Sequence, residues 1–370
     1  MRAFVLLCLI SVVSAPLKAE ESFPAPALGT EKKTTKTPVD TPDVPYIASL
    51  DTYGSDRISE PVVRKVLGKE LDEWLKKGVT GDPSAVALQK TITKKLNDKF
   101  KFEFIQWSIM QYLQPGDLAI RVTLDVVEPQ DKKRRMPFLP DPKETPVDPA
   151  GLIKKWQDYQ ATALELGNKG ELDSVEIKCP GALHCLFGHM HPKLKPFGEY
   201  FTREVNRNLA PLTAVLQKHK DGDSRGAAAF LLAYHKDGAK VVDLLVDRIH
   251  DPDSLVRNNA LRVLGDIAEF HPNFKIPVQP VAEALDFPLV TDRSKALFVL
   301  YALAESDERA QKVATDHASA LLSLLRSEQP NQSGVAYAIL RRISGKNFAP
   351  TEYDKWKGWY NRLPAQQKKN

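Results

Sequence analysis

The spacing of hydrophobic residues along this chain changes twice, and each change predicts a different kind of structure. The clearest pattern runs from Leu118 to Glu128, where apolar and polar residues alternate as in a strand with one buried face. Residues 46–54 and 101–110 are also predicted as strands, and two amphipathic helical segments lie between them. The sequence therefore predicts a small α+β domain over residues 46–128, with the order β-α-α-β-β.

The two C-terminal strands of this domain differ in their patterning. In the last strand, every second residue from Leu118 to Val126 is apolar and is expected to face the core. The polar residues between them, which are expected to face water, are Arg121, Thr123 and Asp125. The preceding strand changes phase after Phe104, which predicts either a bulge or two covered faces.

The order of these elements, Gly54 after the first strand and the V-V-E end of the last strand before Pro129 resemble a POTRA domain. This is the polypeptide-transport-associated module of periplasmic proteins that assemble or secrete other proteins. The resemblance covers residues 47–128 and implies binding of a peptide or protein partner by strand addition at an exposed sheet edge. Residues 101–110 are the candidate edge, and an unrelated small α+β domain is the alternative. The candidate partner-binding residues on this strand are Phe102, Phe104 and Trp107.

From residue 209 the hydrophobic spacing is helical and repeats itself. Each of four aligned segments has alanine three positions and leucine seven positions after the aligned residue, and each follows another amphipathic helix. Helix pairs with this period stack so that each pair covers the next. Residues 209–345 are therefore predicted to form an all-α solenoid. The aligned residues are Arg225, Arg257, Arg293 and Ser333.

The second of these segments, DPDSLVRNNALRVLGDIAE, resembles a HEAT repeat. The resemblance rests on Asp251 and Pro252 in the turn between two helices, and on an alanine-rich second helix that begins near Arg257. It implies that Arg257 pairs with Asp251 or Asp253, in its own or the neighbouring turn. The residues expected to be structural are Arg225, Arg257, Arg293, Asp251 and Asp253.

The residues after the last predicted repeat contain an aromatic cluster. Trp356, Trp359 and Tyr360 lie on one face of a short predicted helix within residues 346–364. A similar tail follows bacterial secreted HEAT arrays, which implies a cap over the apolar face of the last pair. An exposed aromatic platform for a ligand is the alternative.

The first residues predict where the protein functions. Residues 1–19 have one arginine, an apolar run and then small residues, which is the pattern of a secretory signal peptide with cleavage after Ala19. Residues 20–45 are rich in proline, threonine and lysine and are predicted to be a disordered tether. We therefore expect a periplasmic or secreted protein in an oxidising compartment.

Charge adds little to this picture. The chain has 52 basic and 47 acidic residues, and a net charge of +5 is too small to indicate a nucleic-acid partner. Residues 129–150 contain six prolines and one basic run, which predicts a stiff, solvated linker. Peripheral contact of this run with an anionic membrane surface is the alternative. The run consists of Lys132, Lys133, Arg134 and Arg135.

A cysteine- and histidine-rich segment, CPGALHCLFGHMHP, lies within residues 151–208, the predicted helical cap at the start of the solenoid. In an oxidising compartment Cys179 and Cys185 are predicted to form a disulfide, which stabilises the fold by up to ~3 kcal/mol. His184 and His189 are expected at the rim of this loop, with its leucines and phenylalanine inside. A metal site is the alternative, although the ligand spacing is unlike that of zinc sites. Its ligands would include His184, His189 and His191.

The sequence contains none of the common motifs for nucleophilic catalysis, nucleotide binding or metal-dependent hydrolysis, and none for a cofactor. We therefore expect a non-enzymatic scaffold or adaptor in envelope assembly, with a protein or an extended peptide as its partner. A secreted protein that binds a small ligand or a metal around residues 179–191 is the first alternative. An enzyme with an unrecognised site is the second.

Overall fold

The computed structural model describes residues 45–114, 117–172 and 179–364. These residues form two units. The first comprises the described residues up to Met136 with the short segments Pro288–Val290 and Ser327–Pro330, and the second comprises Pro137–Phe287, Thr291–Arg326 and the residues from Asn331 onward. The expected signal peptide and, apart from Pro45, the expected tether lie outside the described residues.

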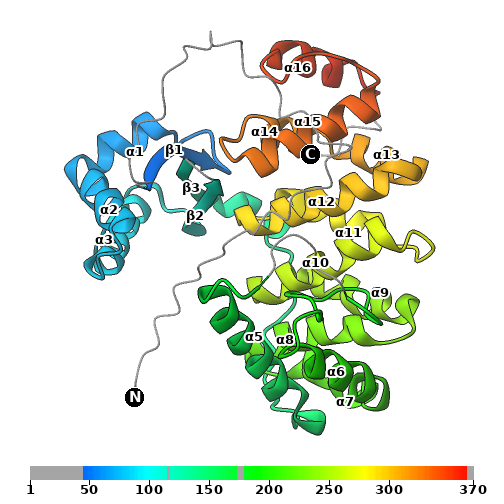
Figure 1. Ribbon diagram of the computed structural model, residues 1–370. Helices are drawn as coiled ribbons and strands as arrows, with labels where there is room; N and C mark the ends of the chain where they lie inside the picture. The colour runs from blue at the N-terminus through cyan, green and yellow to red at the C-terminus, as the bar shows by residue number, and fades with distance from the viewer. Residues whose placement is uncertain (1–44, 115–116, 173–178, 365–370) are drawn as a thin grey trace, which may run out of the picture. The chain divides into compact units, whose positions relative to one another are not determined.

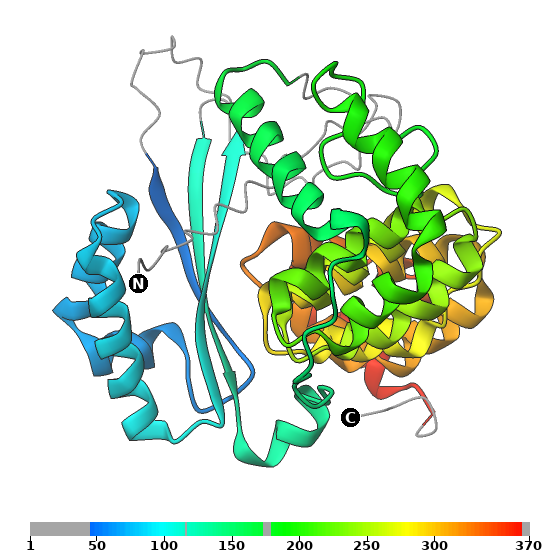
Figure 2. The ribbon, with the colours of Figure 1, turned by 90° about the horizontal axis from the view of Figure 1, so that it is seen from below.

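The first unit is a three-stranded sheet with helices on one face, as Figure 2 shows. The strands are β1 (Tyr46–Tyr53), β2 (Phe104–Gln114) and β3 (Asp117–Val127), and the helices are α1 (Glu60–Leu67), α2 (Lys69–Val79) and α3 (Ser84–Phe100). The strand order is β1-β3-β2, with β1 parallel and β2 antiparallel to β3. The α+β prediction is confirmed. Gly68 has a φ of +54° and divides the first predicted helix into α1 and α2.

The core of this unit lies between the sheet and its helices. The apolar face of β3 is buried there as predicted, with Val122 and Leu124 fully covered. Trp74 of α2 packs against Trp107 of β2 with 4.7 Å between ring centroids, and the Trp107 indole donates a hydrogen bond to the Thr93 hydroxyl at 3.0 Å. Burial of such large aromatic rings is the dominant stabilising contribution in a unit of this size.

Of the two alternatives for β2, the structure excludes the bulge, because its pairing with β3 is regular from end to end, and the only register shift between described strands lies between β1 and β3. The other alternative, two covered faces, fits the burial of Trp107 and Met110, which lie on opposite faces of β2. The prediction for β3 is wrong in one respect. The second face of β3 is not solvated, because Thr123 and Asp125 are buried. Buried polar groups need hydrogen-bond partners, and Asp125 accepts one from the Ser108 hydroxyl at 2.5 Å while Thr123 accepts one from Gln329 at 3.0 Å.

The second unit is a solenoid of helix pairs (Figure 1). The pairs are α7 (Leu209–Lys218) with α8 (Gly222–Leu231), α9 (Gly238–Val246) with α10 (Ser254–Phe270), α11 (Val278–Glu283) with α12 (Val290–Ser306), and α14 (Ala318–Leu325) with α15 (Pro330–Ser344). Short 3-10 turns extend three of these helices: Leu232–Tyr234, Asp247–His250 and Ala284–Asp286. The predicted solenoid is confirmed. The aligned residues Arg293 and Ser333 are farther apart in sequence than the earlier aligned residues, because an additional helix, α13 (Glu308–Asp316), lies between them.

The repeated alanines and leucines lie where these helices meet. The alanine of each copy is fully buried, which allows two backbones to approach closely, and the leucine of each copy fills the space between pairs. These residues are Ala228, Ala260, Ala296 and Ala336, and Leu232, Leu264, Leu300 and Leu340. Two helices precede the first pair, α5 (Leu152–Asn168) and α6 (Lys195–Arg207), and α16 (Tyr353–Asn361) follows the last.

The proline-rich segment after β3 differs from the expected free linker. It begins with a 3-10 turn (Pro129–Asp131) and a helical turn, α4 (Lys132–Arg135), and a further 3-10 turn (Pro149–Gly151) leads into α5. Between them the chain is extended but bonded to the solenoid. The Leu139 amide donates a hydrogen bond to the His250 backbone carbonyl at 2.7 Å. The Glu144 amide donates to the Lys218 carbonyl, and the Glu144 carbonyl accepts from the Lys220 amide. None of the described helices is long and apolar enough to cross a membrane.

Candidate functional site

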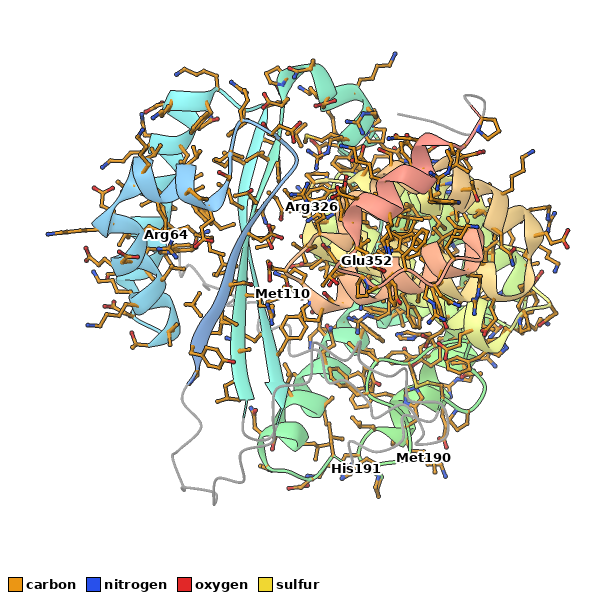
Figure 3. All side chains as sticks on the ribbon, turned by 90° about the horizontal axis from the view of Figure 1, so that it is seen from above. Arg64, Met110, Met190, His191, Arg326 and Glu352 are labelled. Carbon is orange, nitrogen blue, oxygen red and sulfur yellow. A yellow bond between two sulfur atoms is a disulfide. The ribbon has the colours of Figure 1, made fainter. Side chains whose placement is uncertain are left out.

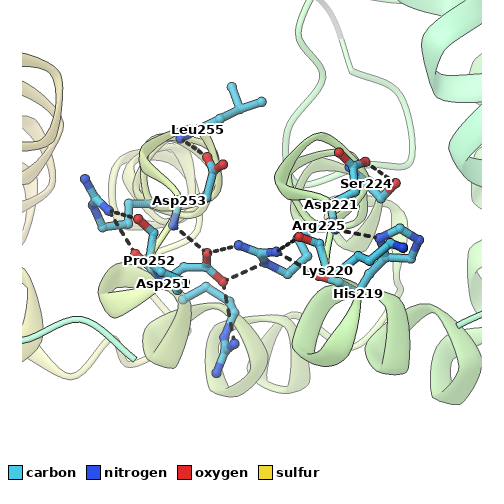
Figure 4. A network of polar contacts seen from close by, with 11 residues as sticks. His219, Lys220, Asp221, Ser224, Arg225, Asp251, Pro252, Asp253 and Leu255 are labelled. Carbon is cyan, nitrogen blue, oxygen red and sulfur yellow. Dashed lines mark hydrogen bonds and ion pairs between the residues drawn. The ribbon is translucent and has the colours of Figure 1, made fainter. Parts of the chain in front are cut away.

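The arginines at the start of the second helices connect consecutive repeats. Arg225 donates from Nε and Nη2 to the two carboxylate oxygens of Asp251, at 3.1 and 2.6 Å, as Figure 4 shows. Its Nη1 donates to the His219 carbonyl, and both members of the pair are buried. A planar guanidinium matches a carboxylate in this bidentate geometry. These residues are therefore structural, and they join α8 to the turn of the next pair.

Arg257 repeats this arrangement one pair further along, with a partner that the sequence did not indicate. Its carboxylate partner is Asp292 of α12, instead of Asp251 or Asp253. Asp251 contributes its backbone carbonyl to Arg257, and Asp253 caps α10 by accepting the Leu255 amide at 2.8 Å. The sequence places an acidic residue in the turns but does not indicate which repeat contains the arginine that it pairs with.

Arg293 occupies the same position in the third pair. It is fully buried, and its Nη1 donates to the Phe287 carbonyl at 2.9 Å. The arginine of each of the first three copies thus bonds a carbonyl of the turn just before its own helix.

The loop between α5 and α6 contains the predicted disulfide. Cys179 and Cys185 are bonded, which confirms the prediction. The loop lies along the solenoid, where the Leu183 amide donates to the Ala233 carbonyl at 2.8 Å. It therefore joins the end of the first repeat pair to the helices that precede it.

The histidines of this loop are not at its rim. His184 and His189 are each 6% exposed, and the ring of His184 stacks on Phe230 of α8. His189 contacts the Tyr234 hydroxyl at 2.6 Å, and burial lowers the pKa of His189 to about 4. The two histidines fill the contact between the loop and the first repeat pair.

His191 lies at the outside of this loop beside the exposed side chain of Met190, as Figure 3 shows. Its Nδ1 accepts the Lys193 amide at 3.2 Å. The three histidines thus have separate partners, and the described residues contain no group of three acids, histidines or cysteines placed to hold a metal ion. The alternative of a metal site on this loop is not supported by the arrangement.

The second helices of the middle repeats also carry a group of charged residues that no sequence motif marks. We define the second-helix face as Arg262 and Asp266 of α10 with Lys295 and Phe298 of α12. Asp266 Oδ2 lies within hydrogen-bond distance of His184 Nδ1, at 2.6 Å, so this face adjoins the disulfide loop. Burial and the neighbouring charge of Arg262 lower the pKa of Lys295 to about 8. A charged residue with such a shifted pKa in a sheltered position marks a candidate binding site.

The strand expected at the sheet edge is at an edge. In the strand order of the described residues β2 pairs with β3 alone, and Ile109 of β2 is 47% exposed. Phe102 and Trp107, however, are buried in the core of the unit, and Phe104 is partly buried. These three side chains hold the edge in place, so a partner at this strand would use its backbone groups and Ile109.

Most residues of the basic run, Lys132 to Arg135, have partners within the first unit. Arg135 is 2% exposed, and its Nη1 donates to the carbonyls of Val126 and Gly54 at 2.6 and 3.2 Å. Lys132 pairs with Glu103 at 2.6 Å, and Arg134 pairs with Asp131 within the same turn. Lys133 is exposed. Arg135 is thus part of the first unit, because a helical turn directs it back onto the sheet.

The C-terminal tryptophans are covered. Trp356 is fully buried and meets the rings of Tyr337 and Phe348 edge to face, while its indole nitrogen donates to the Ala349 carbonyl at 3.0 Å. Trp359 is 8% exposed and Tyr360 is partly buried. This packing does not provide the exposed aromatic platform that was the alternative.

The comparison with protein-family models agrees with the repeat pattern. Residues 209–286 match the family model described as HEAT repeats. The crystal structure of an engineered protein matches with 18% identity and a TM-score of 0.35, and the match covers 56% of this chain and 85% of that chain. The search of curated proteins found no match. The matched HEAT repeats span α7 to α11 and include the Arg225–Asp251 pair.

Proposed function

We propose that this chain, in which residues 209–286 match the HEAT-repeat model, is a non-enzymatic scaffold or adaptor of the periplasm that binds a protein or an extended peptide. HEAT repeats are in general scaffolds for protein interaction, since stacked helix pairs offer long surfaces and few strained loops. The observation that carries the proposal is the match of the HEAT-repeat model to residues whose helix pairs the structure joins by buried ion pairs.

The proposed mode of binding is strand addition at β2. The first unit has the β-α-α-β-β order of a POTRA domain when α1 and α2, which are separated only at Gly68, are counted as one helix. In the described strand order β2 is an edge strand, with an exposed isoleucine at position 109. Both features support strand addition, because an added strand gains affinity from backbone hydrogen bonds along an unpaired edge. Strand addition does not require exposed aromatic residues on β2, because the backbone groups of the edge make the hydrogen bonds.

The proposed location rests on the sequence of residues 1–19, with support from the Cys179–Cys185 disulfide, since disulfides persist in oxidising compartments. Assembly of the cell envelope is the process we propose for the adaptor, because the POTRA resemblance points to it. Mass spectrometry of the protein from its native cells tests the location. A mature N-terminus at Glu20 in a periplasmic fraction is the expected result, and an intact Met1 in the cytoplasm would contradict it.

Cross-linking in native cells, followed by affinity purification of the full chain, tests the adaptor function. We expect one or a few envelope proteins that also bind the purified protein directly. Recovery of the protein alone at native abundance would argue against an adaptor.

A further inference from the structure

Two cationic side chains on neighbouring second helices lie close together without a protein partner. Arg262 of α10 and Lys295 of α12 are sheltered, and the pKa of each is lowered by burial. The Nε of Arg262 is buried without an acceptor. Among the described residues, neither side chain has a hydrogen bond or an ion pair.

The nearest carboxylate, Asp266, forms no salt bridge with either described cation, although its charge favours the charged form of both. Asp266 lies one turn after Arg262 on α10, where a salt bridge is the usual arrangement. Its Oδ2 instead contacts His184 Nδ1 at 2.6 Å, and the other ring nitrogen of His184 is buried without a partner. Among the described residues, the hydrogen-bond partner of Asp266 is therefore His184 of the disulfide loop, and not Arg262 or Lys295.

Arg262 and Lys295 are each partly buried, and most polar groups that are withdrawn from water in proteins are paired. The arginines at the repeat junctions obey this rule: Arg225 bonds both carboxylate oxygens of Asp251, and Arg257 donates twice to one oxygen of Asp292. Arg262, five residues after Arg257, and Lys295, two residues after Arg293, have no such partner among the described residues. Such a departure in a sheltered position is typical of a ligand site.

We propose that Arg262 and Lys295 form an oxyanion site on the second-helix face that takes a single phosphate or carboxylate group. The guanidinium offers parallel N–H donors, and the ammonium adds a point charge. Phe298, one turn after Lys295 on α12, is 39% exposed and provides an apolar surface for the part of the ligand that carries the oxyanion.

The surrounding acids limit the size of the anion. Glu269 follows Asp266 on α10, and burial, together with the charges of Asp266 and Glu305, raises the pKa of Glu269. With these carboxylates near two cations, the site suits one oxyanion group and disfavours a polyanion such as nucleic acid. The proposal does not depend on the adaptor function, because small molecules test it.

The experiment is isothermal titration calorimetry of the full mature chain at low ionic strength and pH 7 with four probes. Phosphate and phenyl phosphate form one arm, and acetate and phenylacetate form the other. We expect binding in at least one arm, weakened about tenfold or more by Lys295→Met and by Arg262→Met. Lys240→Met, at an exposed position of α9, is the matched control and should bind as the wild type. Phe298→Ala should weaken only the probe that carries a phenyl ring.

Thermal unfolding without an anion separates a binding role from a structural one. Because Lys295→Met removes a sheltered, unpaired charge, we expect this variant to unfold at a higher temperature than the wild type while it binds anions more weakly. The proposal is overturned if the wild type binds none of the four probes, or if both methionine variants bind like the wild type. A lower unfolding temperature for Lys295→Met would likewise assign Lys295 to the structure.

Discussion

Arg257 donates hydrogen bonds from Nε and Nη2 to one carboxylate oxygen of Asp292, at 3.0 and 2.7 Å, and so joins the second helices of two consecutive repeats. Both side chains are buried. The pair Arg225–Asp251 joins the preceding repeat to its neighbour in the same way. The solenoid is thus held at successive junctions by a repeated buried ion pair as well as by apolar packing.

Removal of one partner of such a pair should destabilise the solenoid strongly. Asp292→Ala leaves the Arg257 guanidinium buried with only its carbonyl acceptors, which we expect to lower the free energy of unfolding by about 3–5 kcal/mol. Urea denaturation followed by circular dichroism measures the change. Lys154→Ala removes an exposed pair with Asp158 and is the control, with an expected change within about 0.5 kcal/mol. Equal effects of the two substitutions would show that the buried pair has no special role.

The disulfide should contribute less than the ion pairs because its loop is short. Replacing Cys179 and Cys185 by serine removes a link across a sequence separation of 6, which we expect to cost about 2 kcal/mol or less. Thermal unfolding with and without a reductant measures the effect. The wild type should respond to the reductant and the double variant should not. Two titratable thiols in the unreduced protein, or stoichiometric bound zinc, would be incompatible with the disulfide.

His189 should make stability depend on pH in the acidic range. Its pKa is lowered by burial from 6.5 to about 4, so between these values the unfolded chain binds a proton that the folded chain does not. The free energy of unfolding is therefore expected to fall as the pH falls from about 6.5 to about 4, and to be unaffected by His189 above that range. Urea denaturation at several pH values measures this dependence.

His189→Gln, which keeps an amide near Tyr234, should flatten the curve relative to the wild type in this range. His191→Gln, at the outside of the same loop, leaves His189 in place and should keep the wild-type curve. If His189→Gln follows the wild-type pH dependence, His189 is not the group responsible.

Gly54 should tolerate no side chain. Its φ of +108° is rare for other residues, and an added Cβ would lie 2.0 Å from the Val126 carbonyl oxygen and 2.2 Å from Arg135 Nη1. We expect Gly54→Ala to destabilise the first unit by about 2 kcal/mol or more. Hydrogen exchange of β1 and β3 measures this. Gly78→Ala within α2, where an added Cβ meets nothing within 4 Å, should be neutral or stabilising. Similar exchange in the two variants would contradict the account.

The repeats were predictable because each copy places small and large apolar residues at the same helical positions, and burial at those positions is a local property of the sequence. The partner of Arg257 was not predictable. Asp251, Asp253 and Asp292 all follow or precede turns, and only the packing of one repeat on the next decides which carboxylate reaches the guanidinium.

The second-helix face was hidden in the sequence for a related reason. Arg262 and Asp266 are four positions apart on a helix, which is the ordinary pattern of an exposed surface pair. Only the fold reveals that a loop about 80 residues away in sequence brings His184 to Asp266 and leaves Arg262 without its expected partner. The same loop explains why His184 and His189, polar residues among prolines and glycines, are buried and not at the rim.

The most direct test of the proposed function is site-specific photo-cross-linking in native cells. A photo-reactive amino acid replaces Ile109 on the edge strand β2 or, as a control, the exposed Lys94 on α3. Strand addition at β2 predicts a discrete cross-linked envelope protein from position 109 and none from position 94. No adduct from position 109, or the same adducts from both positions, would contradict it.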